Sequence, residues 1–234
     1  MPGRYYGYYY YDPTYMLIVI SALISLFAQF LVNSRFSKYS RVRSRSGMTG
    51  AQAAERILQS QGIYDVAIQR VSGKLTDHYN PRNKTLNLSD AVYASTSVAA
   101  VGVAAHECGH AVQHQVGYVP IKIRNGIVPI VNVCNTLSMP IFIIGLILGL
   151  GRLAMVGAIL FGAVLVFQLV TLPTEINASR RAMKTLESMY LLECDELTGA
   201  RKTLTAAAMT YVAAVASTAL QFLRLVLLAN RRRD

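Results

Sequence analysis

Length, composition and charge together indicate a membrane protein. The chain has 234 residues, of which 53% are hydrophobic and only 15% are charged, whereas about a quarter of the residues in a typical soluble domain are charged. This composition excludes a disordered chain and argues against an ordinary soluble enzyme. The net charge of +11 could indicate a nucleic-acid partner, but the sequence has no nucleic-acid recognition motif. We therefore expect no nucleic acid, and the anionic lipids of a bilayer as the partner of the basic residues.

The N-terminal 32 residues are predicted to form a membrane anchor. Residues 1–15 are rich in tyrosine, which is typical of an aromatic belt at a membrane surface. Residues 16–32 form an apolar stretch near the lower limit of a membrane span, about 17 residues. Positive charge follows this stretch instead of preceding it, so we expect an uncleaved anchor with its N-terminus outside. The basic cluster that follows contains no acidic residue and consists of Arg35, Lys38, Arg41, Arg43 and Arg45.

The next segment, residues 33–126, is polar enough to form a globular unit. Thr49 and Ser89 stand where N-cap residues of helices are expected, and an Asn-Pro-Arg-Asn turn separates two short strands. The second of these strands is either the sheet edge along which an extended substrate adds or an ordinary part of the core. The predicted elements are a helix over 52–61, a strand over 66–71, hairpin strands over 75–79 and 84–88, and a long helix over 90–115.

Three more apolar segments occupy most of the remaining chain. Residues 127–150 and 153–172 are separated by only two residues and predict a membrane hairpin. The polar stretch after the hairpin is predicted to begin a new helix behind Pro173. The last apolar segment, residues 204–229, either crosses the membrane or lies along it with Arg224 reaching to the surface.

The basic residues set the expected orientation. Residues 33–126 and 174–203 carry 17 of the 23 lysines and arginines, so the positive-inside rule places both on the cytoplasmic side. The chain divides accordingly into an anchor (1–32), a cytoplasmic segment (33–126), a membrane hairpin (127–172), a second polar segment (173–203) and a C-terminal apolar helix with a basic tail (204–234).

The most specific chemical signal is His106-Glu107-Cys108-Gly109-His110. Side chains four residues apart lie on one face of a helix, so the two imidazoles can bind one Zn²⁺. The glutamate after the first histidine can then take a proton from a metal-activated water and pass it to the leaving amine. The motif therefore predicts zinc-dependent hydrolysis of peptide bonds, with Glu107 as the catalytic base.

A catalytic zinc site needs a third protein ligand. His114 continues the same helix, but eight residues correspond to about 12 Å along the axis, which is too far for zinc bonds of about 2 Å. We expect His114 at the surface or in a supporting role. Glu175 is the better candidate, because two membrane segments separate it from His110. An even number of crossings returns the chain to the same side of the membrane.

The combination of these motifs resembles a known group of membrane peptidases. A His-Glu-x-x-His helix followed by a Glu-x-x-Ala-[Ser/Asp]-x-x-Ala helix is similar to the gluzincins, such as HtpX and the CAAX-prenyl proteases. The closer resemblance covers most of the chain, including residues 77–82 and 208–214, and is to the bacterial neutral zinc metallopeptidase family typified by YugP. This resemblance implies that the two histidines of the motif and Glu175 bind zinc and that Glu107 is the base.

Four further residues are candidates for supporting roles. The HtpX-like pattern has an aspartate four residues after the ligand glutamate, where this sequence has Ser179. A serine can orient a ligand histidine only through a weaker hydrogen bond. His78, Tyr79 and Arg180 are candidates for contacts with the substrate or for stabilising the oxyanion, each against a purely structural role.

The sequence thus predicts a mainly α-helical integral protein of the bacterial cell membrane. We expect three to four transmembrane helices and a small α+β, zincin-like catalytic segment at the cytoplasmic face. The predicted function is that of a metalloendopeptidase with one Zn²⁺ per chain, acting on membrane-associated or unfolded proteins. The alternatives are a site-2-type intramembrane protease, although its typical Leu-Asp-Gly triplet is absent, and a non-catalytic membrane adaptor with a structural metal site. Cys108 would be the fourth ligand of such a closed site, but helical geometry turns it away from the histidines.

Overall fold

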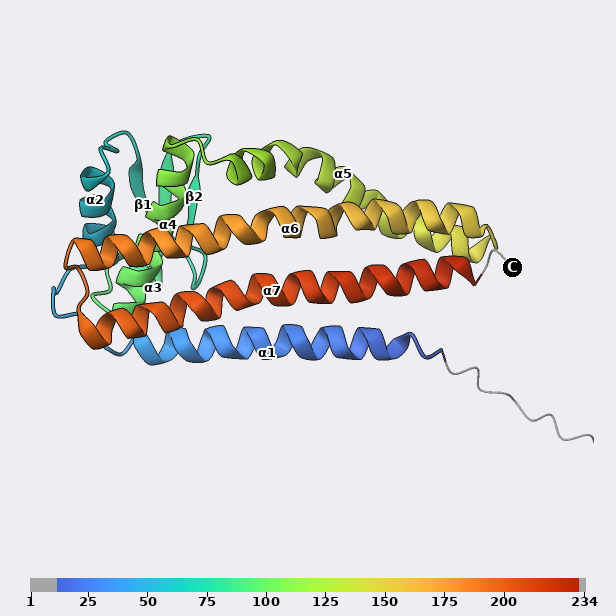
Figure 1. Cartoon of the computed structure of the whole chain (residues 1–234), viewed down its shortest axis with the longest axis horizontal. Coiled ribbons are helices and arrows are strands. Elements are labelled where there is room, and N and C mark those ends of the chain that lie inside the picture. The colour runs from blue at the N-terminus through green and yellow to red at the C-terminus, as the bar shows by residue number, and fades with distance from the viewer. Residues whose placement is uncertain (1–11, 232–234) are drawn as a thin grey trace, which may run out of the picture.

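The computed structural model describes residues 12–231, which form a row of long helices with a smaller α+β unit at one end (Figure 1). The long helices are α1 (Tyr15–Tyr39), α5 (Val119–Ile147), α6 (Gly151–Ser188) and α7 (Cys194–Asn230). The α+β unit lies between α1 and α5 in the chain. Most of the tyrosine-rich stretch, on which the predicted aromatic belt depends, lies outside the described residues.

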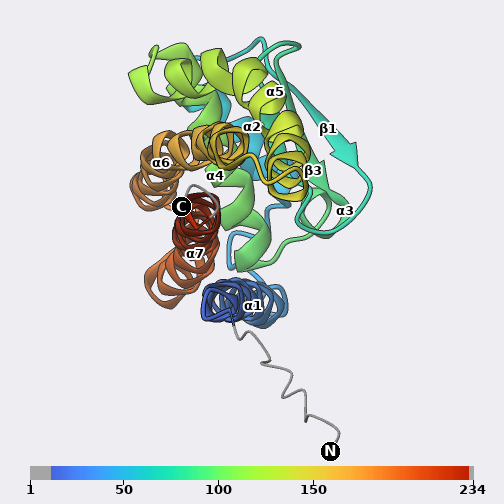
Figure 2. The same ribbon diagram turned by 90° about the vertical axis from the view of Figure 1, so that its right-hand side faces the viewer.

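The long helices confirm the predicted fold class. Within residues 12–231, these four helices are long and apolar enough to cross a membrane, judged by length and composition. Each also leaves most of its apolar window unburied by the rest of the protein, as expected of helices solvated by lipid. They pack in the order α5, α6, α7, α1, and α1 begins and α7 ends at the end opposite the α+β unit (Figures 1 and 2).

Helix α7 runs alongside α1 and does not lie across the other helices (Figure 1). Polar contacts join the two helices at membrane depth, where the Ser217 and Ser25 hydroxyls are 3.0 Å apart. Near the far end, the guanidinium of Arg224 lies 5.2 Å from the ring centre of Tyr15, close enough for a cation–π contact. The last apolar segment is therefore a fourth candidate span, aligned with the other three.

Helix α6 corrects the predicted helix start behind Pro173. It is continuous from Gly151 to Ser188, with the proline inside it. Proline removes one backbone hydrogen bond, but neighbouring helices can support a helix through it, and α6 packs against α4, α5 and α7. As a result, Glu175 belongs to the same continuous helix as the second half of the membrane hairpin.

The α+β unit is built around α4 (Val98–Gln115), which packs against α2 (Gly50–Ser60), α6 and α7. Thr49 caps α2 through a reciprocal capping box with Gln52, so the predicted cap is confirmed. Small side chains fill the helix contacts of α4. Its fully or almost fully buried alanines are Ala99, Ala100, Ala104 and Ala105.

The long helix predicted over residues 90–115 is interrupted in the structure. A single turn, α3 (Asp90–Tyr93), is followed by a break, and α4 starts only after Ser97, whose hydroxyl accepts a hydrogen bond from the backbone N–H of Ala100 at 3.2 Å. Ser89, the predicted cap, stands at the N-cap position of α3 but makes no side-chain capping bond, because its hydroxyl donates to Asp77 at 2.9 Å. Serine and threonine side chains around residue 96 favour caps over helix interiors, which explains the break.

The sheet has the order β1 (Ala67–Val71), β3 (Thr85–Ser89), β2 (His78–Asn80). The predicted hairpin is present, because β2 pairs antiparallel with β3. Strand β1 pairs parallel with the other side of β3, so β3 is central and all five of its residues are buried. The hypothesis that the strand over 84–88 is a substrate-binding edge is therefore wrong, and the edge strand that contacts α4 is β2.

Candidate metal centre

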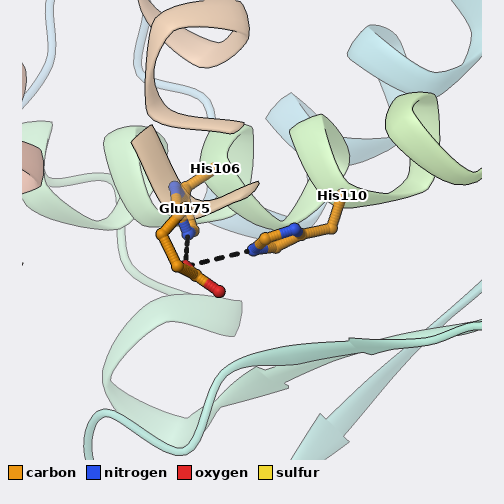
Figure 3. Close-up of side chains that lie close together, drawn as sticks. All are labelled: His106, His110 and Glu175. Atoms are coloured by element: carbon orange, nitrogen blue, oxygen red, sulfur yellow. Dashed lines mark ion pairs between the residues drawn. The ribbon is translucent and has the colours of Figure 1, made fainter. Parts of the chain in front are cut away.

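Three side chains from two helices converge beside the sheet (Figure 3). His106 and His110 project from one face of α4, and their ring centres are 4.8 Å apart. One carboxylate oxygen of Glu175, Oε2, lies 3.3 Å from His106 Nε2 and 3.4 Å from His110 Nε2. One ligand atom from each residue lies within 4.8 Å of the other two.

A glycine in α4 allows α6 to come this close. The Cβ of any larger residue at Gly109 would lie 2.7 Å from the carbonyl oxygen of Ala178 on α6. Ala178 is itself fully buried, so the two helix backbones are almost in contact at this point. Because Glu175 lies one helical turn before Ala178, this contact determines how closely its carboxylate approaches the histidines.

The Nδ1 atom of each histidine is held by a polar side chain. Ser179 Oγ lies 3.1 Å from His106 Nδ1, which is the supporting position predicted for this serine. Gln113 Oε1 lies 3.0 Å from His110 Nδ1. These contacts leave the Nε2 atom of each ring directed at Glu175 (Figure 3).

Gln113 was not identified from the sequence. It is completely buried, and its amide nitrogen donates to the Thr174 carbonyl at 2.8 Å and to Asn177 Oδ1 at 2.9 Å. Because both donors are used on α6, the amide oxygen must accept, and His110 Nδ1 must carry the proton. Its Nε2 therefore keeps a lone pair for a metal. The sequence feature that could have identified Gln113 is a polar residue three positions after a candidate ligand, on a helix face otherwise lined by small residues.

The residues present fit a divalent cation. Within the described part of the chain, Glu175 Oε2 is buried without a hydrogen-bond partner, although it faces two imidazole nitrogens. Burial lowers the pKa of His110, but the hydrogen bond and the charge of Glu175 raise it by more, so the net shift of this pKa is upward. Two nitrogens and a carboxylate oxygen around an unsatisfied buried atom form a ligand set that zinc prefers.

Glu107 lies next to this group and is held by the sheet. It is only 7% exposed, and its Oε2 accepts a hydrogen bond from the backbone N–H of Tyr79 on β2 at 3.0 Å. The edge strand thus fixes the carboxylate through its main chain. The role of Tyr79 in the structure is this backbone contact, which residue type alone does not reveal.

A cavity of about 340 Å³ opens onto the two carboxylates and His106. Membrane helices supply much of its wall, including Gln29 from α1 and Tyr211 from α7. Tyr211 and Glu175 line this cavity together, whereas the sequence marked residues 208–214 only for their resemblance to the family. Asp77 also lines the cavity; burial raises its pKa, and the hydrogen bonds from Ser89 offset only part of that rise.

The side chains of the three predicted substrate contacts lie elsewhere. His78 is held on the sheet by the Thr76 carbonyl, 2.9 Å from its Nδ1, and by the Asn87 amide. The Tyr79 hydroxyl lies 3.2 Å from Nδ1 of His114. Arg180 is exposed and lines a separate groove between α6 and α7.

The positions of His114 and Cys108 agree with the geometric argument made from the sequence. His114 is exposed and is not part of the three-residue group. The Cys108 thiol is fully buried and lies 3.5 Å from the Ala54 carbonyl of α2, so it points away from the histidines. Because Cys108 shares α4 with both histidines, no rotation of this helix could bring all three side chains to one metal ion.

The site combines two histidines one helical turn apart with a glutamate from a second helix and an adjacent buried glutamate. Set beside membrane helices, this combination defines a zinc metallopeptidase of the membrane-embedded class. Sequence comparison agrees with this assignment. The chain belongs to the neutral zinc metallopeptidase family, whose model, described as "Putative neutral zinc metallopeptidase", matches residues 14–230.

One curated relative is similar over almost its whole length. It is the "Putative membrane protease YugP" of Bacillus subtilis (strain 168), which is 44% identical over 221 residues, covering 94% of this chain and 98% of the relative. No solved structure matches the chain. The comparisons confirm the predicted family and the predicted class of membrane zinc peptidase.

Proposed function

We propose that this protein is a membrane endopeptidase in which His106, His110 and Glu175 hold one Zn²⁺ per chain and Glu107 transfers the protons of the reaction. The observation that carries the proposal is the buried, unpartnered Oε2 of Glu175, which faces Nε2 of both histidines at 3.3 and 3.4 Å. When bound, zinc activates water for attack and polarises the scissile carbonyl.

Glu107 supplies the acid–base chemistry. Its carboxylate is fixed beside the cavity by the Tyr79 backbone N–H, where it can accept a proton from the attacking water and later give it to the leaving amine. The buried position limits its exchange of protons with bulk solvent. A neutral amine leaves more easily than an amide anion, so this second transfer is needed for the bond to break.

Tyr211 is the proposed oxyanion donor. Its side chain lines the same cavity as Glu107 and Glu175, and its O–H group can donate a hydrogen bond to the negative charge that develops on the carbonyl oxygen. Donors directed at that charge contribute roughly 10²–10³ to kcat in other hydrolases. The side chains of His78 and Arg180 lie outside the cavity, which favours Tyr211 for this role.

The position of the cavity suggests the substrate class. Gln29 and Val32 of α1 lie in its wall, together with residues of α7, so the cavity is at the level where membrane helices meet the α+β unit. We infer that the substrates are membrane-associated or unfolded proteins that reach this level. A folded soluble protein would have to unfold locally to place a peptide bond there.

The orientation follows from charge. The segments that meet at the α+β end carry 17 of the 23 basic residues, so the active site is assigned to the cytoplasmic face of the bacterial cell membrane. The cluster from Arg35 to Arg45 would then contact anionic lipids of the inner leaflet. Cysteine labelling at an exposed position such as Tyr64, in intact cells and in lysed cells, tests this orientation: reaction only after lysis is expected.

The zinc site is tested by elemental mass spectrometry of detergent-purified protein. We expect about one zinc per chain in the wild type and in Glu107→Gln, and a sharp loss in Glu175→Ala. Glu187→Ala is the matched control, because this exposed glutamate lies on the same helix. Cleavage of denatured casein should require Glu107. Zinc retained by Glu175→Ala would exclude this residue as a ligand, and casein cleavage by Glu107→Gln at the wild-type rate would overturn the mechanism.

A further inference from the structure

A second depression adjoins the catalytic cavity, between α6 and α7. This groove has a volume of about 410 Å³ and is lined by four residues of α6 between positions 176 and 183 and by four residues of α7 between positions 201 and 208. On each helix, these residues follow the spacing i, i+3, i+4, i+7, which is one helix face. The groove is therefore formed by the facing sides of two long helices.

The groove and the catalytic cavity share part of their lining. Ser179, Leu204 and Ala208 line both of them. Ser179 also contacts His106 Nδ1 at 3.1 Å, so the groove starts directly beside the metal centre. A substrate chain that leaves the catalytic cavity past these shared residues would enter the groove.

The groove combines an apolar lining with unpaired positive charge. Ile176, Met183 and Leu204 supply apolar surface, and Arg180 and Arg201 supply two guanidinium groups. Both arginines are exposed. Among residues 12–231, neither of them pairs with a carboxylate, whereas other arginines do so.

We propose that this groove binds the substrate chain on one side of the scissile bond, and that Arg180 and Arg201 select an acidic side chain there. The inference rests on the proposed peptidase function and adds a substrate preference to it. Arginine presents a planar set of donors that matches a carboxylate. The apolar lining would hold the aliphatic parts of the neighbouring substrate residues.

The geometry also limits which substrate position is read. Arg180 lies five residues beyond Glu175, which corresponds to about 7.5 Å along the helix and about 140° around it. An extended peptide advances about 3.3 Å per residue. The acidic side chain is therefore expected at least about two residues from the cleaved bond, at one fixed position and on one side only.

The test is a cleavage profile obtained without knowledge of the natural substrate. Zinc-loaded full-length protein in detergent is incubated with a synthetic peptide library in which every residue occurs at every position, and the cut sites are read by mass spectrometry. Glu107→Gln defines the background. The wild type should favour Asp or Glu at one position by about 3- to 10-fold, since each exposed charge pair is worth at most a few-fold.

The variants separate the groove from general charge effects. Arg180→Gln and Arg201→Gln should each reduce the acidic preference, and Arg201→Glu should shift it towards Lys or Arg. Lys184→Gln on α6 and Lys202→Gln on α7 remove an equal charge beside the groove without lining it, so they should keep the preference. A reversal of preference in Arg201→Glu is not expected from a purely structural role.

Three results would overturn the inference in distinguishable ways. Cleavage without an acidic preference, or with one that both glutamine variants retain, would exclude the groove as a selective site and leave the peptidase intact. The arginine-to-glutamine variants could instead keep the cleavage profile but lose the stimulation of cleavage by phosphatidylglycerol vesicles relative to phosphatidylcholine vesicles. That result would show that the two arginines bind lipid. No cleavage above the Glu107→Gln background would refute the proposed function itself.

Discussion

Replacing Gly109 by alanine should weaken zinc binding by separating two helices. Gly109 faces the backbone of Ala178, and an added Cβ would lie 2.7 Å from the carbonyl oxygen and 3.2 Å from Cα of that residue. The neighbouring atoms are backbone, so they cannot rotate away as a flexible side chain would. Helix α6 must therefore shift, and it takes Glu175 with it.

The size of the effect can be worked out from this contact. The carbonyl contact is about 0.7 Å shorter than an ordinary van der Waals contact, which begins at 3.4 Å, whereas ligand distances in metal sites hold within about 0.2 Å. Overpacking of this kind typically costs about 1–3 kcal/mol. If this whole free energy is lost from metal binding, the zinc dissociation constant rises by roughly 5- to 150-fold.

The assay is a competitive zinc titration against a chelator, together with a thermal melt of the metal-free protein. Gly126→Ala is the matched control, because Gly126 is also helical and an added Cβ there meets no atom within 4 Å. Both substitutions gain the same helix propensity, about 1 kcal/mol. The difference between the variants therefore isolates the helix contact.

Three results would refute this reasoning. Wild-type zinc affinity in Gly109→Ala would show that α6 accommodates the methyl group without moving Glu175. A lower melting temperature with unchanged zinc affinity would show that the strain falls on the fold and not on the site. An effect of Gly126→Ala equal to that of Gly109→Ala would mean that the loss does not arise from the contact with Ala178.

Four further substitutions, at three positions, test the side chains around the site. Gln113→Leu should weaken zinc binding by roughly 10- to 100-fold, because His110 loses the partner that orients it. Ser179→Ala should weaken it by a smaller factor, since it removes one weak contact to His106, and Ser179→Asp should strengthen it, because a carboxylate holds the imidazole N–H more firmly. Tyr211→Phe should keep its zinc and lower kcat on casein by roughly 10²–10³ with little change in KM.

Each of these variants has a control on a nearby exposed residue. Gln115→Ala, Ser188→Ala and Tyr190→Phe change the same residue types outside the cavity and should keep wild-type zinc affinity and kcat. Equal zinc affinity in Gln113→Leu and Gln115→Ala would contradict the orienting role of Gln113. Weaker zinc binding in Ser179→Asp would contradict the proposed role of position 179, and loss of zinc from Tyr211→Phe would make this tyrosine a structural residue.

Sequence alone determined the features that depend on local spacing. Histidines four residues apart share a helix face in any helix, so the placement of His106 and His110 followed from the motif. Apolar stretches of sufficient length identified the membrane helices, and the even number of spans between His110 and Glu175 placed both at the same end. The Thr49 cap and the hairpin turn are equally local, because neighbouring side chains and backbone form them.

Tertiary packing determined the local structure at positions where two sequence signals competed. Ser89 and Ser97 both stand at the N-cap position of a helix, but the Ser89 hydroxyl donates to Asp77 and only Ser97 caps its helix through its side chain. Pro173 is a helix breaker by type, yet α6, which packs against α4, α5 and α7, continues through it. Strand β3 became central only because β1 pairs along its second side.

The remaining parts of the site come from contacts between distant helices. Three such pairs join positions more than 30 residues apart in the chain: Gly109 against Ala178, Gln113 against Thr174, and Tyr211 in the same cavity as Glu175. No periodicity within one segment encodes such pairs. Helical spacing determines which side chains share a face, but only the packing of whole helices determines which faces meet. The zinc ligands of α4 could therefore be found from the sequence, whereas the residues that hold and complete the site required the structure.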